Sequence, residues 1–457
     1  MFTCENCGGA LRFDIASGKL ICDSCLSTYA VGSVKDAQAA EESEEMDAKV
    51  FRCPQCGGEI MTIDEAAAAF CSYCGSSNVL ESRMTGVKKP KYIIPFKKTK
   101  EDCKELYLSK VKKNIFAPKE LRNPAYLDRF RGIYTPYWIY GIDIDADASF
   151  EGEESHRRGD YIIEDTYMMT CHVDANYDGI SYDSSSSFDD EICQEIAPYP
   201  DNEFREFDSG YISGFYADVA DVDGAVYMKD AADLTVDSVM TSVRSEFTGI
   251  DSMNTPSGGY GPKLNPSCNY PESAMFPVWF LSYRNKDRVA YGVVNGLTGK
   301  LSIDMPISVL KYLLFSILLA VPMFFVLNLG LVLTPSAGVI ATVIMAIIGV
   351  ITFFVNLGSI KKQETKELDK GYTSIYGKPG KTSHKGYFIG AILPIIAIVV
   401  ALAIWFISPV SDIYYYAASL FVIVATGLML IELIKQYNIL STRPLPQFNK
   451  DRGEVDA

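Results

Sequence analysis

The 457-residue sequence predicts a multidomain protein with two small cysteine-rich modules, an α+β domain and an all-α bundle of four membrane-spanning helices. Three observations lead to this fold class. Eight of the twelve cysteines form two copies of one spacing pattern near the start of the chain. Four long apolar runs follow residue 305, and the region between shows mainly the alternating pattern of strands.

The cysteine pattern indicates metal binding. In each copy, two Cys-x-x-Cys pairs are separated by 14 residues, and the first pair runs into Gly-Gly. Two such turns complete a tetrahedral shell of four thiolates that suits zinc, whereas disulfides or unrelated thiols would not explain the repeated spacing. The expected ligands are Cys4, Cys7, Cys22 and Cys25 in the first copy and Cys53, Cys56, Cys71 and Cys74 in the second.

We therefore expect two zinc ribbons, at residues 1–34 and 51–85, joined by an acidic linker at 35–50. Each would hold one structural Zn²⁺, because a closed four-cysteine site leaves no coordination position for a substrate. Nucleic acid is an unfavourable partner, since residues 1–85 carry 6 Lys and Arg against 13 Asp and Glu. The ribbons are better suited to binding protein.

Residues 86–305 are expected to form a cytoplasmic α+β domain. Residues 100–116 and 231–247 have helical patterns, residues 138–150 alternate like a strand, and residues 289–303 have the pattern of a hairpin. Residues 141–251 contain 28 Asp and Glu against 5 Lys and Arg. The basic segment 88–131 either offsets this charge or touches anionic lipid.

Catalytic patterns are missing from this domain. Cys171 and His172 are neighbours on an expected strand, so their side chains point to opposite faces. Cys103, Cys193 and Cys268 are expected to be packing residues, like Cys171. We therefore predict that the protein is not an enzyme; a carboxylate pair hidden among the many acids is the alternative.

Four apolar runs of about 22 residues make residues 306–435 a transmembrane domain, followed by a tail at 436–457. The link after the second run carries seven lysines, whereas the links after the first and third carry none. By the positive-inside rule, the lysine loop and both termini face the cytoplasm. A multi-pass protein of the cell membrane is expected, with its cysteines in a reducing compartment where thiols stay available for metal.

The order of these parts resembles a family of bacterial membrane proteins with two N-terminal TFIIB-type zinc ribbons. The resemblance rests on the ribbons and on later motifs: Ile94-Pro95-Phe96, Tyr134-Thr135-Pro136-Tyr137-Trp138, Phe276-Pro277-Val278-Trp279 and Asn295-Gly296-Leu297-Thr298-Gly299-Lys300. Members are often labelled primosome or helicase-like, but this chain has no helicase motif. The resemblance implies an association with SPFH (stomatin-like) or phage-shock-type proteins in envelope stress.

The sequence thus predicts two small zinc ribbons, an α+β cytoplasmic domain and an all-α four-helix transmembrane domain. The expected function is that of a membrane-anchored adaptor that recruits cytoplasmic or membrane protein partners to the lipid bilayer. A membrane-tethered nucleic-acid-binding protein and an enzyme using the acidic domain are the alternatives.

Overall fold

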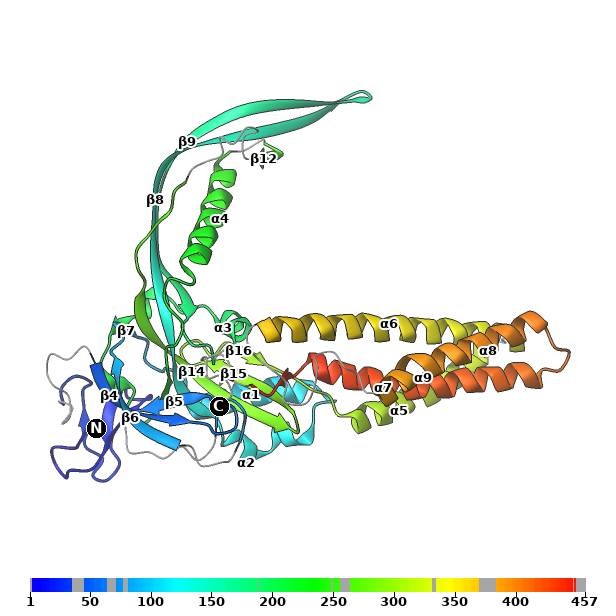
Figure 1. Cartoon of the computed structure of the whole chain (residues 1–457), viewed down its shortest axis with the longest axis horizontal. Coiled ribbons are helices and arrows are strands. Elements are labelled where there is room, and N and C mark those ends of the chain that lie inside the picture. Colours follow the sequence, from blue (N-terminus) through cyan, green and yellow to red (C-terminus); the bar gives the residue numbers. More distant parts are fainter. Residues whose placement is uncertain are drawn as a thin grey trace, which may run out of the picture.

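The computed structural model describes residues 2–34, 45–63, 71–76, 81–187, 189–247, 250–254, 264–330, 334–369, 384–446 and 448. A central body carries the first ribbon at one end and a bundle of long helices at the other (Figure 1). From the same body a long two-stranded arm projects to one side.

The first ribbon is a small sheet of its own. Its three antiparallel strands are β1 (Leu11–Asp14), β2 (Lys19–Cys22) and β3 (Thr28–Tyr29). It docks on the body through β1, because the Phe13 amide donates to the Ser213 carbonyl at 2.9 Å and the Ser213 hydroxyl donates to the Leu11 carbonyl at 2.6 Å. Phe13 also packs edge-on against Tyr211, with ring centroids 5.2 Å apart.

The central sheet follows the order β10-β7-β14-β8-β11-β5-β4-β6 among the described residues. These strands are β4 (Glu45–Arg52), β5 (Glu59–Thr62), β6 (Glu81–Lys88), β7 (Tyr92–Ile93), β8 (Arg131–Arg158), β10 (Arg205–Glu206), β11 (Tyr216–Asp218) and β14 (Glu272–Asn285). Strands off this path are β9 (Tyr161–Asp183), β12 (Ser252–Asn254), β13 (Ser267–Cys268), β15 (Arg288–Asn295), β16 (Leu301–Ile303) and β17 (Arg443–Pro444).

Four of the described helices pack on the strands of this sheet through their buried apolar side chains. They are α1 (Lys100–Lys113), α2 (Pro124–Leu127), α3 (Asp190–Ile196) and α4 (Met228–Glu246). Helix α1 begins at a capping box formed by Thr99 and Asp102 and buries Cys103, Tyr107 and Val111. Helices α1 and α4 and the β15–β16 hairpin lie close to the bounds predicted from the sequence, so these three predictions are confirmed.

The two aromatic-proline motifs, residues 134–138 and 276–279, lie inside strands β8 and β14 and pair with each other. Strands β8 and β14 run antiparallel, with Phe276 opposite Thr135 and Ala274 opposite Tyr137. The rings of Tyr137 and Phe276 stack at 4.4 Å in the core of the sheet. The motifs therefore form one aromatic core across a strand pair.

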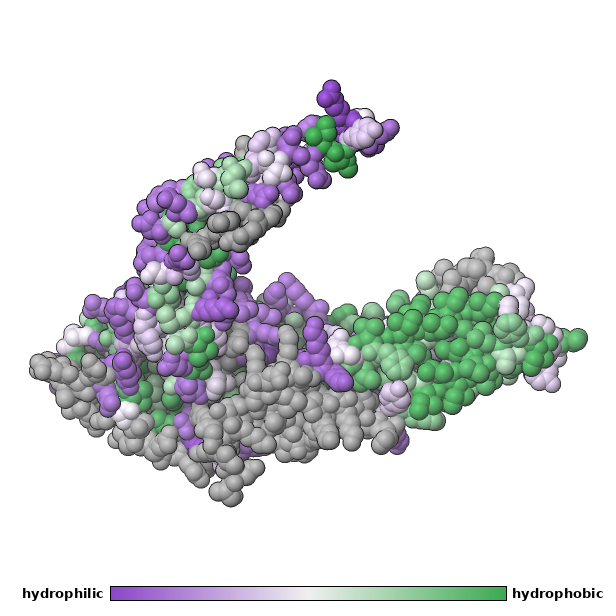
Figure 2. Space-filling view, turned by 45° about the horizontal axis from the view of Figure 1, so that its top comes forward, coloured by the Kyte–Doolittle hydropathy of each residue, from purple (hydrophilic) through white to green (hydrophobic). Residues whose placement is uncertain are grey.

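The helical bundle consists of α5 (Val309–Gly330), α6 (Pro335–Asp369), α7 (His384–Tyr387), a π-turn (Phe388–Ile392), α8 (Leu393–Ile407) and α9 (Ile413–Leu440). Alanines at the contacts of α6, α8 and α9 let the helices pack closely, among them Ala346, Ala397 and Ala425. The face of the bundle seen in Figure 2 is largely hydrophobic.

Three of these helices are long and apolar enough to cross a membrane: Pro335–Gln363, Lys385–Ile407 and Ile413–Leu440. Among the described residues, α5 contributes a shorter apolar stretch, Val309–Met323. The structure therefore supports three of the four predicted spans by length and composition.

Three predicted boundaries differ from the structure. Residues 45–50 of the expected linker are the first part of β4, because Met46, Ala48 and Val50 alternate as buried residues while the strand pairs with β6. The remainder of that linker, 35–44, lies outside the described residues. The expected second ribbon continues into the central sheet through β5 and β11. The tail returns to the body, where β17 pairs with β15.

Candidate metal centres

Each of the four Cys-x-x-Cys pairs forms the same tight turn. In the first, the Gly8 amide donates to the Cys4 carbonyl at 2.8 Å and the Cys4 amide donates to the Gly9 carbonyl at 2.7 Å. The same two bonds recur at Cys22, Cys53 and Cys71. This turn requires a positive φ at the residue after the second cysteine of the pair, and that residue is glycine in three of the four turns.

Leu26 is the exception. It occupies the position of Gly8, Gly57 and Gly75, and its φ is 59°. A side chain in this region is strained by about 1 kcal/mol or more. The Leu26 side chain is also 76% exposed, so it gains no buried packing that would compensate for the backbone strain.

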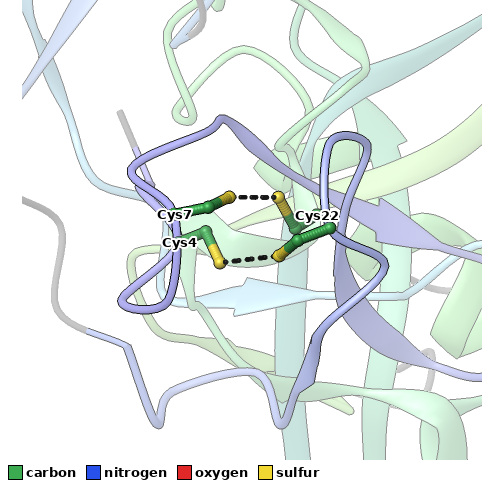
Figure 3. Close-up of side chains that lie close together, drawn as sticks. Cys4, Cys7 and Cys22 are labelled. Carbon is green, nitrogen blue, oxygen red and sulfur yellow. Dashed lines mark hydrogen bonds between the residues drawn. The ribbon is translucent and has the colours of Figure 1, made fainter.

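The first centre brings Cys4, Cys7, Cys22 and Cys25 together (Figure 3). The Sγ atoms of Cys4 and Cys25 lie 3.5 Å apart, as do those of Cys7 and Cys22. A Zn–S bond of about 2.3 Å places sulfurs about 3.8 Å apart in a tetrahedron. The Tyr29 hydroxyl, 3.3 Å from Cys4 Sγ, lowers the pKa of this thiol to about 6 and so favours the thiolate.

The second centre has the same geometry. The Sγ atoms of Cys53 and Cys74 lie 3.8 Å apart, and those of Cys56 and Cys71 lie 3.6 Å apart. In both clusters all four sulfurs lie within 4.8 Å of one another. Each predicted set of four therefore closes on itself, and each has the donor set and spacing of a zinc site.

The two centres differ in burial. All four ligands of the second centre are buried, whereas Cys7 and Cys25 of the first are exposed. The second centre is enclosed by the body: the Tyr291 hydroxyl donates to the Tyr73 carbonyl at 2.9 Å, and Arg284 donates to the side-chain carbonyl of Gln55 at 2.8 Å. The second centre is thus part of the domain core, while the first lies at the surface.

The remaining cysteines and His172 lie outside both clusters. Cys103 and Cys193 are buried, and Cys171 and Cys268 are half-buried. His172 faces solvent on the arm, where its Nδ1 lies 3.1 Å from Asp147. Residues 138–150, which were predicted to be a strand, lie within β8.

Carboxylates do gather at one cavity of the acidic domain. A cavity of about 460 Å³ is lined by Asp178, Asp201 and Glu272. Glu272 forms an ion pair with Lys91, so the negative charge of this carboxylate is already balanced.

Two surrounding features were missed by the sequence analysis. Leu26 could have been found, because aligning the four cysteine pairs shows glycine at the equivalent position in the other three. Phe448, whose ring packs 5.5 Å from Tyr73 beside the second centre, carries no local signal.

Fold and sites define a protein with two four-cysteine clusters, a mixed α/β domain and a C-terminal region of long apolar helices. The chain is distantly homologous to the uncharacterized protein YdjG of Bacillus subtilis strain 168, with 26% identity over 311 residues that cover 67% of this chain and 90% of YdjG. No protein-family model matches the chain, and no solved structure matches it.

Proposed function

We propose that this protein is a membrane-anchored zinc-ribbon adaptor that recruits a protein partner from the cytoplasm. One observation carries the proposal, namely the contrast between the two metal centres. The second centre is built into the domain core, so its role is structural. The first presents Leu26 to solvent in a strained conformation, at a position where glycine would serve the turn better.

Strain that packing does not explain supports a role in recognition. An exposed leucine on a metal-fixed turn is a rigid apolar contact point, because zinc coordination holds both ends of the turn. The surroundings are polar and mixed in sign, with Arg12 paired to Asp23 at 2.7 Å. A protein surface with an apolar pocket fits this turn better than the phosphate backbone of a nucleic acid does.

The anchor consists of α5, α6, α8 and α9, with both termini on the cytoplasmic side. Helix α5 has 22 residues, which is enough to cross the hydrocarbon core as a fourth span. Lys361, Lys385 and Lys435 mark one end of the bundle, while the first residues of α6 and the link between α8 and α9 lie at the other. This charge asymmetry supports a cytoplasmic position for the body.

The test uses the full chain in its native membrane. A photo-crosslinking amino acid replaces Ser24 beside the turn, and crosslinked protein is compared between wild type and Leu26→Gly. Glycine relieves the strain, so this variant keeps both zinc sites and loses only the leucine side chain. We expect one dominant crosslinked partner, with at least a tenfold loss in Leu26→Gly, the loss typical of a hot-spot residue.

A matched control is Leu234→Ala, which removes an exposed leucine from α4. This variant should leave crosslinking unchanged. Equal crosslinking in wild type and Leu26→Gly would overturn the assignment of this turn as the binding surface. Salt-sensitive retention of DNA or RNA by the full chain would instead favour the nucleic-acid alternative.

A further inference from the structure

The arm is the least explained part of the molecule. Strands β8 and β9 pair along most of their 28 and 23 residues, joined by a turn at Gly159, whose φ is 67°. Its first part is braced: α4 packs Ala231, Val239 and Val243 against it, and β12 pairs with residues 151–153. The first part of the arm is therefore held in place by α4 and β12.

Beyond this brace the arm ends in a tip that exposes two large hydrophobic side chains. Tyr161 is 78% exposed and Ile162 is 72% exposed. In the strand register, Tyr161 lies opposite Arg158, and Ile162 lies opposite Arg157. The tip thus combines an aromatic ring, an aliphatic side chain and two arginines with one acidic residue, Asp160, in the turn. Its net charge is positive, and aromatic and basic residues together are typical of membrane–water interfaces.

The arm also points in a specific direction. It leaves the body sideways and then bends, so that its tip points the same way as the helical bundle (Figure 1). Turned about the long axis, the molecule still shows the tip level with the near end of the hydrophobic bundle surface (Figure 2). That end carries Lys361, Lys385 and Lys435, which mark the cytoplasmic boundary of the bilayer.

Charge limits the contact to the tip. Acidic residues follow directly behind it on both strands: Glu151, Glu153 and Glu154 on β8, and Glu164 and Asp165 on β9. An anionic lipid surface attracts Arg157 and Arg158 but repels this acidic stretch. The arm would therefore touch the headgroups with its end and stay out of the membrane along its length.

We propose that the arm tip, residues 157–162, is a second membrane contact that binds anionic lipid headgroups of the leaflet facing the body. This proposal rests on the membrane anchor of the proposed function. With the bundle as the first attachment and the tip as the second, the body is held in a fixed orientation above the membrane.

The experiment follows tryptophan fluorescence of the full chain in vesicles of phosphatidylcholine with about one third anionic phosphatidylglycerol. Tyr161→Trp is introduced in a Trp405→Phe background, and the emission of that background, which still contains Trp138 and Trp279, is subtracted. The remaining probe emission is quenched either by brominated lipid or by aqueous iodide. We expect a blue-shifted probe that brominated lipid quenches and iodide does not. Reversing Arg157 and Arg158 to glutamate should abolish quenching by lipid, as should vesicles without anionic lipid.

His172→Trp, an exposed position farther from the tip beside Asp145 and Asp147, is the matched control and should be quenched by iodide alone. Native Trp405 in α8 reports separately on the anchor when the emission of the Trp405→Phe variant is subtracted, because it is quenched by brominated lipid only if the bundle spans the bilayer. Quenched Trp405 with an iodide-accessible probe at 161 would overturn the tip contact and leave the anchor intact. Unquenched Trp405 would overturn the anchor and the tip contact together.

Discussion

The backbone amide of Phe448 donates a hydrogen bond to the carbonyl oxygen of Cys56 at 2.7 Å. This bond joins the chain after its last apolar helix to a ligand of the second metal centre. The Phe448 side chain is 1% exposed and fills the space above Gly58, where a Cβ atom would meet its ring at 3.1 Å. The segment that follows α9 thus closes the second centre.

Phe448→Ala should therefore loosen the second centre. Truncation of a buried phenylalanine costs about 3–5 kcal/mol, and here the cavity would open beside Tyr73 and the Cys56 turn. In a Cys22→Ser background that isolates the second centre, zinc transfer to a chromogenic chelator should become at least tenfold faster. Leu234→Ala on the exposed face of α4 should leave the rate unchanged. An unaltered rate in Phe448→Ala would show that the tail does not protect the metal.

Metal loss should affect the two centres unequally. Metal analysis of the full chain should find about two zinc ions, and Cys22→Ser should retain one, because each ribbon closes its own shell. Loss of the first site should shift the thermal unfolding of the body only slightly, since that ribbon is a separate sheet that contacts the body mainly through β1. Cys56→Ser should lower the unfolding temperature of the body by several degrees, because this substitution removes a metal site within the core. Equal shifts in both variants, or loss of both metals in Cys22→Ser, would contradict this difference; Cys103→Ala should keep both metals.

The metal ligands could be predicted because zinc coordination is encoded locally. Two Cys-x-x-Cys turns at fixed spacing are enough to define a site, and both clusters formed as expected. The unusual Leu26 was equally visible, since three glycines mark its position. The arm also has a local signal that was missed: Gly159-Asp160 lies between two strand-like runs and is typical of a tight hairpin.

What could not be predicted depends on contacts distant in sequence. The second ribbon joins the body because Ile60 pairs with Asp218 and because Phe448 returns from the end of the chain. No periodicity within residues 51–85 encodes these partners. For the same reason, residues 45–50 read as an acidic linker by composition, although pairing with β6 makes them a strand.

Membrane topology is tested by cysteine labelling in intact cells. A cysteine placed at Ser336, at the start of α6, or at Ser411, just before α9, should react with a membrane-impermeant maleimide added outside. A cysteine placed at Thr373, in the lysine-rich link outside the described residues, should react only after permeabilisation. Both surface cysteines of the first ribbon, Cys7 and Cys25, should be protected as well. The reverse pattern would place the ribbons outside the cell and overturn the proposed adaptor role.

The last prediction concerns Asp218, which is fully buried at the end of β11 beside the second ribbon. Burial raises the pKa of this carboxyl to about 7, although the Ser185 hydroxyl and the Val219 amide donate hydrogen bonds to it. An unfolded chain ionises this group near pH 4, whereas the folded chain holds it protonated up to about pH 7. The folded state therefore loses stability as pH rises through this window.

Asp218→Asn removes the titration and keeps most of the shape. The difference in unfolding free energy between variant and wild type should grow in favour of the variant from pH 5 to pH 8. A raised pKa of about three units corresponds to a difference on the order of 4 kcal/mol above pH 7. Comparing the two proteins at each pH cancels the protonation of the metal thiolates, which both share. Denaturation of the full chain in nanodiscs measures the difference; one that stayed constant with pH would show that Asp218 is ionised in the folded protein.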